Sequence, residues 1–425
     1  MSKWIRTSAA LVLLVCLALL SGCATPIGVK KLSPQKAYQN AYANPLNAGV
    51  LSDQAKSVFN RYDLLKQFDQ DPASTLAILH QQALDDERGD ILYALAEGTY
   101  LYGSELARSV QVEEQELAPD YFMLSALYSW YFVRAERANQ SLNIFDNRAR
   151  AAIDMYNFGL WQAFENGGTE GLVLKSSERK LPFGMISISL DTSQFPWKIE
   201  EFEKFLPADR YAVRGVSVRN RVAGIGLPMI AIREESGQAV PATAILRVEG
   251  DLATLNANAE RATLELYSTK DTATVQSKDG IAIPLESDLT TPLAYRMEGS
   301  SAFDLNLGVF LGKEPNTIPD GLYMTEDYRP GKIPVVLVHG TASSPVWWVE
   351  LLNTLTADPQ IRERYQFWYF VYTSNKPVAM SAAELRDALN EKMALLDPQG
   401  KDMALRQMVV AGHSQGGASD QVYRG

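Results

Sequence analysis

The sequence predicts a multidomain protein with a helical N-terminal region, a β-rich middle and an incomplete parallel α/β sheet at its C-terminus. Three observations lead to this fold class. Apolar residues first recur at helical spacing, then follow short alternating runs separated by glycine and proline, and finally fully apolar strands alternate with amphipathic helices. A length of 425 residues with 46% hydrophobic and 21% charged residues is typical of several globular domains.

The first residues have the pattern of a secretory signal peptide. Lys3 and Arg6 precede the apolar run "AALVLLVCLALL", which is short for a membrane-spanning helix. The last leucine of this run begins "LSGC", which resembles the lipobox of bacterial lipoproteins, whose cysteine is acylated and becomes the mature N-terminus. The resemblance implies a signal peptide over 1–22 and a lipid anchor on Cys23 in the bacterial cell envelope. Ala24 follows the cysteine, which in that family favours the outer membrane. The alternative is an ordinary signal peptide with a chance cysteine.

The cysteine and histidine counts restrict the possible chemistry. One of the two cysteines, Cys16, lies inside the predicted signal peptide. We therefore expect no disulfide, cysteine nucleophile or cysteine-ligated metal in the mature chain. The three histidines are far apart in sequence, so no metal site is expected, and no cofactor is predicted. A net charge of −10 without a basic stripe argues against nucleic acid as a partner.

Residues 23–175 are predicted to form a helical domain. Two segments begin with an N-cap residue followed by proline, Ser33 with Pro34 and Asp71 with Pro72. Small and aromatic residues recur as in helical hairpins of the tetratricopeptide kind, although no repeat of fixed period is present. The region is interpreted either as a concave surface for a protein partner or as a plain helical bundle with an aromatic core, and the bundle is favoured.

Residues 181–310 are predicted to form a β-rich domain, either a β-sandwich or a β-rich insertion. This stretch contains no histidine and no recognisable catalytic motif. Residues 311–331 contain several prolines and glycines and are expected to form a linker. The clearest predicted strands are "GMISISL", "YAVRGVSVRN", "PMIAIRE", "ATAILRVEG" and "ATLELYST".

Residues 332–425 alternate between strand and helix patterns. The strands "IPVVLVHG", "QFWYFVYTSN" and "QMVVAG" are mostly apolar, as in parallel strands buried on both faces. The helix predicted after the first strand starts near Trp347 and Trp348, which we expect to pack rather than to line a substrate pocket. In the helix predicted after the second strand, Ser381 and Glu384 have the spacing of a capping box. This order predicts a parallel sheet with its site at the carboxyl ends of the strands.

The third strand runs into "GHSQGG", which places Ser414 on a sharp turn before the next helix. A residue that joins a strand directly to a helix has a strained backbone, and side chains two positions before and after it would collide. Glycine is therefore required at Gly412 and Gly416. We expect the Ser414 hydroxyl to stand clear of the sheet, beside helix amides that can stabilise a negatively charged oxygen.

Together, "PVVLVHG" and "GHSQGG" resemble the α/β-hydrolase superfamily and, within it, the bacterial lipases and esterases. The resemblance implies that Ser414 is the nucleophile that attacks the carbonyl carbon of a carboxylic ester, lipid-like or otherwise. It also implies an oxyanion hole built from the amides of Gln415 and Thr341, with Gly340 allowing close approach. The expected activity is ester hydrolysis through an acyl-serine.

The remaining triad members are not found. In that superfamily the acid and the histidine follow the nucleophile, but "QGGASDQVYRG" has no histidine, and Asp420 is too near Ser414 to end a later strand. His339 and His413 are expected to brace loops, and His80 lies in the helical region. We therefore expect this chain to be inactive or nearly so, since loss of the triad base costs several orders of magnitude in rate. The alternative is an envelope-anchored binding or scaffold lipoprotein with a vestigial hydrolase segment.

Overall fold

The structure is a computed structural model that divides into two compact units, Met1–Ala43 and Asn44–Gly425. In the first unit, α2 (Pro34–Ala41) has Ser33 as its N-cap and Pro34 in its first turn, so this predicted helix start is confirmed. None of the helices in the described ranges is both long and apolar enough to cross a bilayer. The structure describes residues 27–417 except 87, 139–144, 166–169, 234–237, 278–279, 298–318, 341–347 and 374–375.

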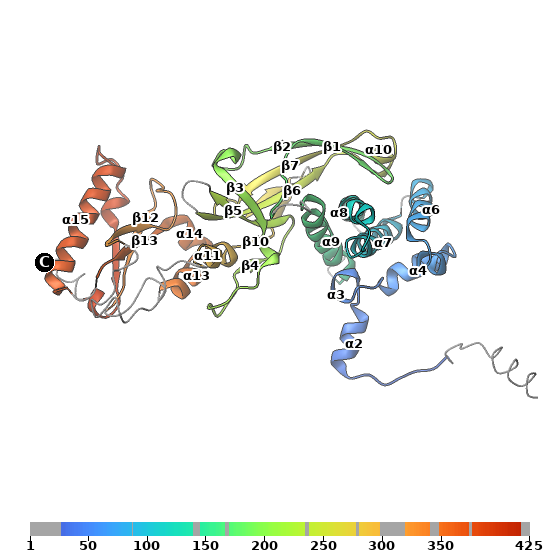
Figure 1. Cartoon of the computed structure of the whole chain (residues 1–425), viewed down its shortest axis with the longest axis horizontal. Coiled ribbons are helices and arrows are strands. Elements are labelled where there is room, and N and C mark those ends of the chain that lie inside the picture. Colours follow the sequence, from blue (N-terminus) through green and yellow to red (C-terminus); the bar gives the residue numbers. More distant parts are fainter. Residues whose placement is uncertain are drawn as a thin grey trace, which may run out of the picture. The chain divides into compact units, whose positions relative to one another are not determined.

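Helices form the first part of the second unit (Figure 1). The Asp71 carboxylate caps α6 by accepting a hydrogen bond from the Ser74 amide, and Pro72 occupies the first turn, as predicted. Helix α7 packs against α4, α6 and α8, and α8 packs against α9. The bounds are α3 (Pro45–Ala48), α4 (Asp53–Arg61), α5 (Leu65–Phe68), α6 (Pro72–Asp85), α7 (Gly89–Leu106), α8 (Val112–Ala138) and α9 (Asn147–Phe164).

The middle of the chain forms a six-stranded mixed sheet with the order β1-β2-β7-β6-β5-β3. Strands β2 and β7 are parallel, and the other neighbours are antiparallel. The large strands are β1 (Ser177–Leu181), β2 (Gly184–Asp191), β3 (Phe202–Pro207), β5 (Leu227–Arg233), β6 (Ala239–Val248) and β7 (Glu260–Ser268). The remaining strands and α-helices described here are β4 (Arg221–Val222), α10 (Leu252–Asn256), β8 (Thr274–Gln276), β9 (Ala282–Pro284), β10 (Ser287–Asp288) and α11 (Thr290–Met297).

Four of the five predicted strands of this region are present, but "YAVRGVSVRN" is irregular. Its polar groups bind helix α13 (Val349–Ala357) instead of a neighbouring strand. The Ser217 amide donates to the Glu350 carboxylate at 3.1 Å. The Asn220 side chain donates to the carbonyl oxygen of Asn353 at 2.6 Å. The prediction of a strand from alternating polar and apolar residues is therefore wrong here. The polar groups of the segment form tertiary hydrogen bonds in an irregular conformation instead.

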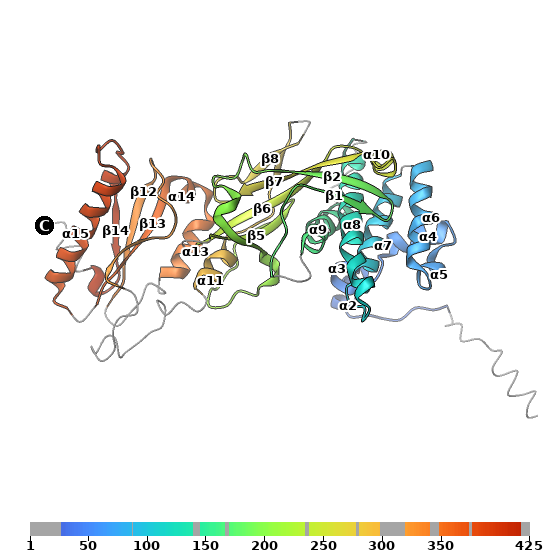
Figure 2. The ribbon, with the colours of Figure 1, turned by 45° about the horizontal axis from the view of Figure 1, so that its top comes forward.

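The helices and the six-stranded sheet share one hydrophobic core. A continuous cluster of buried residues extends from Leu51 to Leu285 and includes Phe132 of α8 and Ile186 of β2. The Tyr156 hydroxyl of α9 donates to the Leu246 carbonyl at 2.7 Å and accepts from the Leu246 amide at 2.8 Å. Figure 2 shows α8 and α9 beside this sheet. The helical and β-rich regions are thus joined by packing as well as by the chain.

The last part of the chain forms a four-stranded sheet with the order β11-β13-β12-β14. Strand β12 is parallel to both β13 and β14, and the three predicted apolar strands are present. Strand β11 is antiparallel to β13 and lies in the segment expected to be a linker, so that part of the linker prediction is wrong. The bounds are β11 (Gly321–Met324), β12 (Ile333–Val338), α13 (Val349–Ala357), α14 (Pro359–Arg364), β13 (Tyr365–Val371), α15 (Val378–Leu396) and β14 (Val409–Gly412).

Helices cover both faces of the four-stranded sheet (Figure 2). On one face, Leu385 and Leu389 of α15 are buried in a cluster with Trp368. On the other, Leu352 of α13 is buried in a cluster with Phe367. Successive residues of β13 thus point to opposite faces, and both faces are apolar, which explains the continuous apolar pattern of this strand.

Helix α15 begins at Val378, three residues before the predicted start, with Pro377 as its N-cap. Ser381 is therefore buried inside the helix, and the predicted capping box is wrong. Glu384 instead accepts a hydrogen bond from Lys376 at 2.7 Å. The proline explains the earlier start, since its fixed φ favours a position at or just before the first helical turn.

Candidate functional site: the turn at Ser414

Ser414 lies just beyond the carboxyl end of β14, where that strand runs parallel to β12. Val338 pairs with Gly412 in the register of these strands. The His413 amide continues the pairing by donating to the Val338 carbonyl at 3.0 Å. Helical residues begin directly afterwards, and the Gly417 amide donates to the Ser414 carbonyl at 3.0 Å. The serine therefore occupies a direct strand-to-helix turn with an exposed side chain.

The backbone of Ser414 is in the left-handed region, with φ +58°. For a residue other than glycine this conformation costs about 1–2 kcal/mol. A Cβ atom on Gly412 would lie 2.3 Å from the backbone of Gly416, as the spacing of the two glycines predicted. At Gly416 the closest atoms belong instead to the last residue of β12 and the residue after it, since a Cβ there would lie 2.5 Å from the Val338 carbonyl oxygen and 2.6 Å from that of His339.

The loop after β12 approaches Ser414 closely. A Cβ atom on Gly340 would lie 3.0 Å from the Cβ of Ser414 and 3.0 Å from Nδ1 of His413. The residue proposed for half of the oxyanion hole, Thr341, lies outside the described residues. The other, Gln415, begins the helical residues after the turn, and its side-chain amide donates to the Lys376 carbonyl at 3.5 Å. Gly340 and Ser414 are therefore brought together, as the sequence predicted.

His339 is buried and uses both ring nitrogens. Its Nδ1 lies 3.0 Å from the Gly340 carbonyl oxygen, and its Nε2 accepts from the Tyr372 amide at 3.2 Å. Its ring stacks on Tyr372, with centroids 4.5 Å apart. Burial lowers the pKa of His339 below its ordinary value. The neutral tautomer protonated on Nδ1 satisfies both contacts, so this ring holds the loop beside Ser414 in place.

The other two histidines do not contact the Ser414 hydroxyl, which makes no hydrogen bond within the described part of the chain. His413 is exposed, and its ring lies perpendicular to that of Trp348 at 6.5 Å. His80 belongs to the core of the helical region, where Nδ1 lies 2.7 Å from the Tyr128 hydroxyl. No base for Ser414 is therefore present among the residues that the structure describes.

Three other residues were singled out from the sequence, and the structure describes one of them. Trp348 is half-buried and packs against the cluster that contains Leu337 and Phe367, which is the packing role that was expected. Trp347 lies outside the described residues, as does the predicted lipid-attachment residue Cys23.

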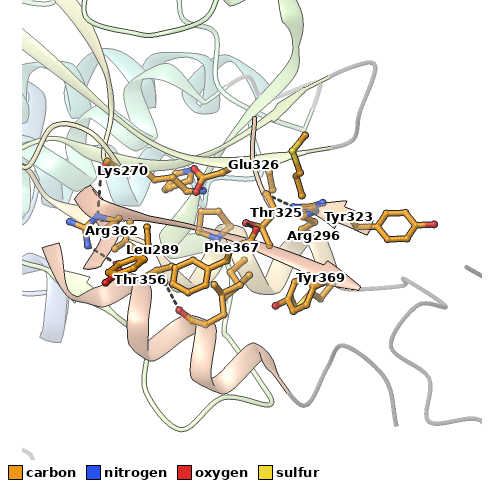
Figure 3. A pocket seen from close by; sticks show the side chains of 18 of the residues that line it. Lys270, Leu289, Arg296, Tyr323, Thr325, Glu326, Thr356, Arg362, Phe367 and Tyr369 are labelled. Carbon is orange, nitrogen blue, oxygen red and sulfur yellow. Dashed lines mark hydrogen bonds and ion pairs between the residues drawn. The ribbon is translucent and has the colours of Figure 1, made fainter. Parts of the chain in front are cut away.

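Sequence reasoning missed a cavity of about 220 Å³ beside the four-stranded sheet (Figure 3). Its walls come from β11, β13, α11 and α13 and from residues of the six-stranded sheet region. No local motif marks it, because its lining residues are distant from one another along the chain. The lining includes Lys270, Leu289, Arg296, Glu326, Phe367 and Tyr369.

The turn at Ser414 combines an exposed hydroxyl, a strained backbone and the start of a helix. A hydroxyl held in this way can attack an electrophilic carbon once a base removes its proton. Within the described ranges, no group of histidine, cysteine, aspartate and glutamate side chains could hold a metal ion. No family model, no curated protein and no solved structure matches this chain.

Proposed function

We propose that Ser414 is the nucleophile of a serine hydrolase that cleaves carboxylic esters. The observation that carries the proposal is the positive φ of Ser414 on a strand-to-helix turn, which close packing at Gly412 and Gly416 makes possible. A strained conformation of this kind costs stability and tends to persist where function needs it. Attack by Oγ on the ester carbonyl and departure of the alcohol would give an acyl-serine, which water then hydrolyses.

The surroundings of Ser414 support charge stabilisation during this attack. The carbonyl oxygen of the ester becomes negative in the tetrahedral intermediate, and backbone amides aimed at it lower its energy. The Gln415 amide lies at the start of the helix that follows the nucleophile. The loop beyond Gly340 passes within contact distance of Ser414 and could supply a second amide, for which Thr341 remains the proposed donor.

We further propose that this chain hydrolyses esters slowly by itself. Two observations support this: the Ser414 hydroxyl has no partner among the described residues, and His339 uses both ring nitrogens elsewhere. Without a base the hydroxyl is a weak nucleophile, and a positioned base typically contributes about 10²- to 10⁴-fold in rate.

Chemical rescue tests both parts of the proposal. Because Ser414 is exposed, imidazole from solution can reach its hydroxyl and act as the base. We expect imidazole to raise the hydrolysis of p-nitrophenyl butyrate more with the unmodified chain than with Ser414→Ala, after subtraction of the reaction of imidazole alone. We also expect slow labelling of Ser414 by a fluorophosphonate. Rapid labelling without imidazole would contradict the slow chemistry, and equal rates for both proteins would contradict the role of Ser414.

A binding or scaffold role is the second candidate. The observation that favours it is the same absence of a described partner for the Ser414 hydroxyl, which leaves the nucleophile without a visible activator. Identical behaviour of the unmodified chain and Ser414→Ala in the rescue experiment would select this role. The helical region would then be the place to search for a protein partner.

We also propose that Cys23 carries a lipid that anchors the chain to the bacterial envelope, in the outer membrane. The support is the sequence "LSGC" after an apolar segment. Several buried methylenes, each contributing about 0.8 kcal/mol, would hold the chain at a bilayer. We expect Cys23→Ser to abolish incorporation of labelled palmitate and to release the protein from the membrane fraction. The matched control Cys16→Ser lies within the predicted signal peptide and is expected to retain both.

A further inference from the structure

The cavity beside the four-stranded sheet has an apolar interior with a charged rim. Its volume of about 220 Å³ exceeds that of the cavity of about 150 Å³ that is known to bind benzene in an engineered protein. The interior side chains include Leu293, Leu352 and Phe367, which come from α11, α13 and β13. The cavity is separate from the Ser414 turn, because none of its lining residues belongs to that turn.

Among the cations that line the cavity, Arg296 is the least satisfied. Lys270 forms an ion pair with Glu326 at 3.2 Å. Arg362 donates to the carbonyl oxygens of Thr356, Ala357 and Lys270. Arg296 donates only to the Thr325 carbonyl, at 2.6 Å, and has no carboxylate partner among the residues that the structure describes. Its guanidinium therefore retains free donors at the exposed edge of the cavity.

Tyr369 supplies a second unsatisfied group. Its side chain lines the cavity and is 8% exposed, and its hydroxyl is buried without a hydrogen-bond partner in the described part of the chain. Burial raises the pKa of Tyr369, and the nearby Arg296 charge only partly opposes this, so the hydroxyl keeps its proton and can donate. Figure 3 shows Tyr369 and Arg296 at the same end of the cavity. A buried hydroxyl that lacks a partner and faces a cavity is available to hydrogen-bond a ligand there.

We propose that the cavity binds a medium-chain fatty carboxylate. The carboxylate accepts hydrogen bonds from the Arg296 guanidinium and the Tyr369 hydroxyl, and the alkyl chain lies against Leu352 and Phe367. The parallel N–H groups of a guanidinium match the two oxygens of a carboxylate, so we propose a carboxylate as the head group of the ligand. A chain of about eight carbons fits this cavity, given that benzene fills one of about 150 Å³.

Calorimetric titration of the full chain with octanoate tests this proposal, with 1-octanol as a neutral ligand of equal length. We expect octanoate to bind at least tenfold more tightly than octanol. Arg296→Gln should weaken octanoate binding by about tenfold and Tyr369→Phe by about fivefold, because each removes one hydrogen bond to the carboxylate. Two controls should bind as the unmodified chain does: Arg386→Gln, at an exposed arginine paired with Asp387, and Ser414→Ala.

These binding measurements test the proposed fatty-carboxylate site independently of the proposed hydrolase chemistry. Octanol binding as tightly as octanoate, full affinity in Arg296→Gln, or no octanoate binding at all would each overturn it. If Arg296→Gln does not fold, Arg296→Lys keeps the charge without the parallel N–H groups and should lose part of the affinity. Thermal denaturation provides a second measurement. Tyr369→Phe should raise Tm without ligand, by removing an unpaired buried hydroxyl, and should reduce the rise in Tm that octanoate causes.

Discussion

The two larger sheets of the chain are stabilised in different ways. The six-stranded sheet shares one large continuous hydrophobic core with the helices and has one small separate cluster, which contains Leu206 and Ile230. The four-stranded sheet has separate, smaller clusters on its two faces, and β14, which is at the edge among the described strands, leaves Val409 43% exposed. Ser414 follows this edge strand. The difference indicates that the shared core supplies most of the free energy of folding, whereas the geometry of the candidate site depends on a few backbone contacts.

A large-to-small substitution in the shared core should have the largest effect on stability. Phe132 is fully buried, packs 5.3 Å from the ring of Tyr93 and lies under the Arg148 guanidinium. We expect Phe132→Ala to lower the free energy of unfolding by about 3–5 kcal/mol, because it leaves a cavity. Urea denaturation followed by circular dichroism measures this.

The control is Val110→Ala in the same region, where the side chain is 96% exposed. Its effect should stay within about 0.5 kcal/mol, as for most surface substitutions. Similar effects of the two substitutions would contradict the view that this core carries the stability of the region.

A substitution at Gly416, which packs on β12, should have the next largest effect on the free energy of unfolding. Its structural effect should be confined to the surrounding sheet. A side chain at Gly416 would meet backbone carbonyls of Val338 and His339, which cannot move without disturbing the sheet. We expect Gly416→Val to cost about 3 kcal/mol by overpacking and to increase hydrogen exchange in β12 and β14 while leaving the shared core protected. Gly280→Val is the control, since its φ is +74° but no atom of the described residues lies within 4 Å of an added Cβ. Equal losses at both glycines would show that backbone conformation, rather than close approach, decides the effect.

The Ser414 turn could be predicted from the sequence because its requirements are local. A buried strand, two glycines and a serine within five residues leave few conformations open, and the contacts of Gly412 follow from that spacing. The cavity could not be predicted in this way. Arg296, Thr325 and Tyr369 come from three separate segments, and only tertiary packing brings them together. The residues 211–220 show the converse, since a convincing local pattern gave way to hydrogen bonds with α13.

Acidification should weaken both regions, because each contains a buried histidine. Burial lowers the pKa of His80 in the helical region and of His339 beside β12 below the ordinary value of 6.5. The unfolded chain therefore binds more protons than the folded one as the pH falls below about 6.5. The contribution of each neutral histidine to the free energy of unfolding is therefore complete above that pH. Below it, this contribution decreases by at most about 1.4 kcal/mol per pH unit for each histidine.

Nuclear magnetic resonance of the histidine ring protons from pH 7.5 to 5 measures this for each region separately. We expect midpoints below 6.5 for both rings. A midpoint at or above 6.5 for His339 would mean that its ring is not held neutral against Tyr372, and that the loop beside Ser414 is held by other contacts.

The smallest expected effect concerns the strain at the candidate nucleophile. Ser414 and Asn258 both have positive φ, at +58° and +57°, and lie in the two contrasted regions. Glycine relieves this strain but also gains freedom in the unfolded chain, so we expect Ser414→Gly to raise the free energy of unfolding by about 0.5 kcal/mol. Asparagine tolerates this conformation better than serine does, so Asn258→Gly should change less. Ser414→Ala keeps the strain and should be neutral. If Ser414→Gly is instead destabilising, the serine contributes to folding, and its conformation is no longer an argument that the hydroxyl is held there for chemistry.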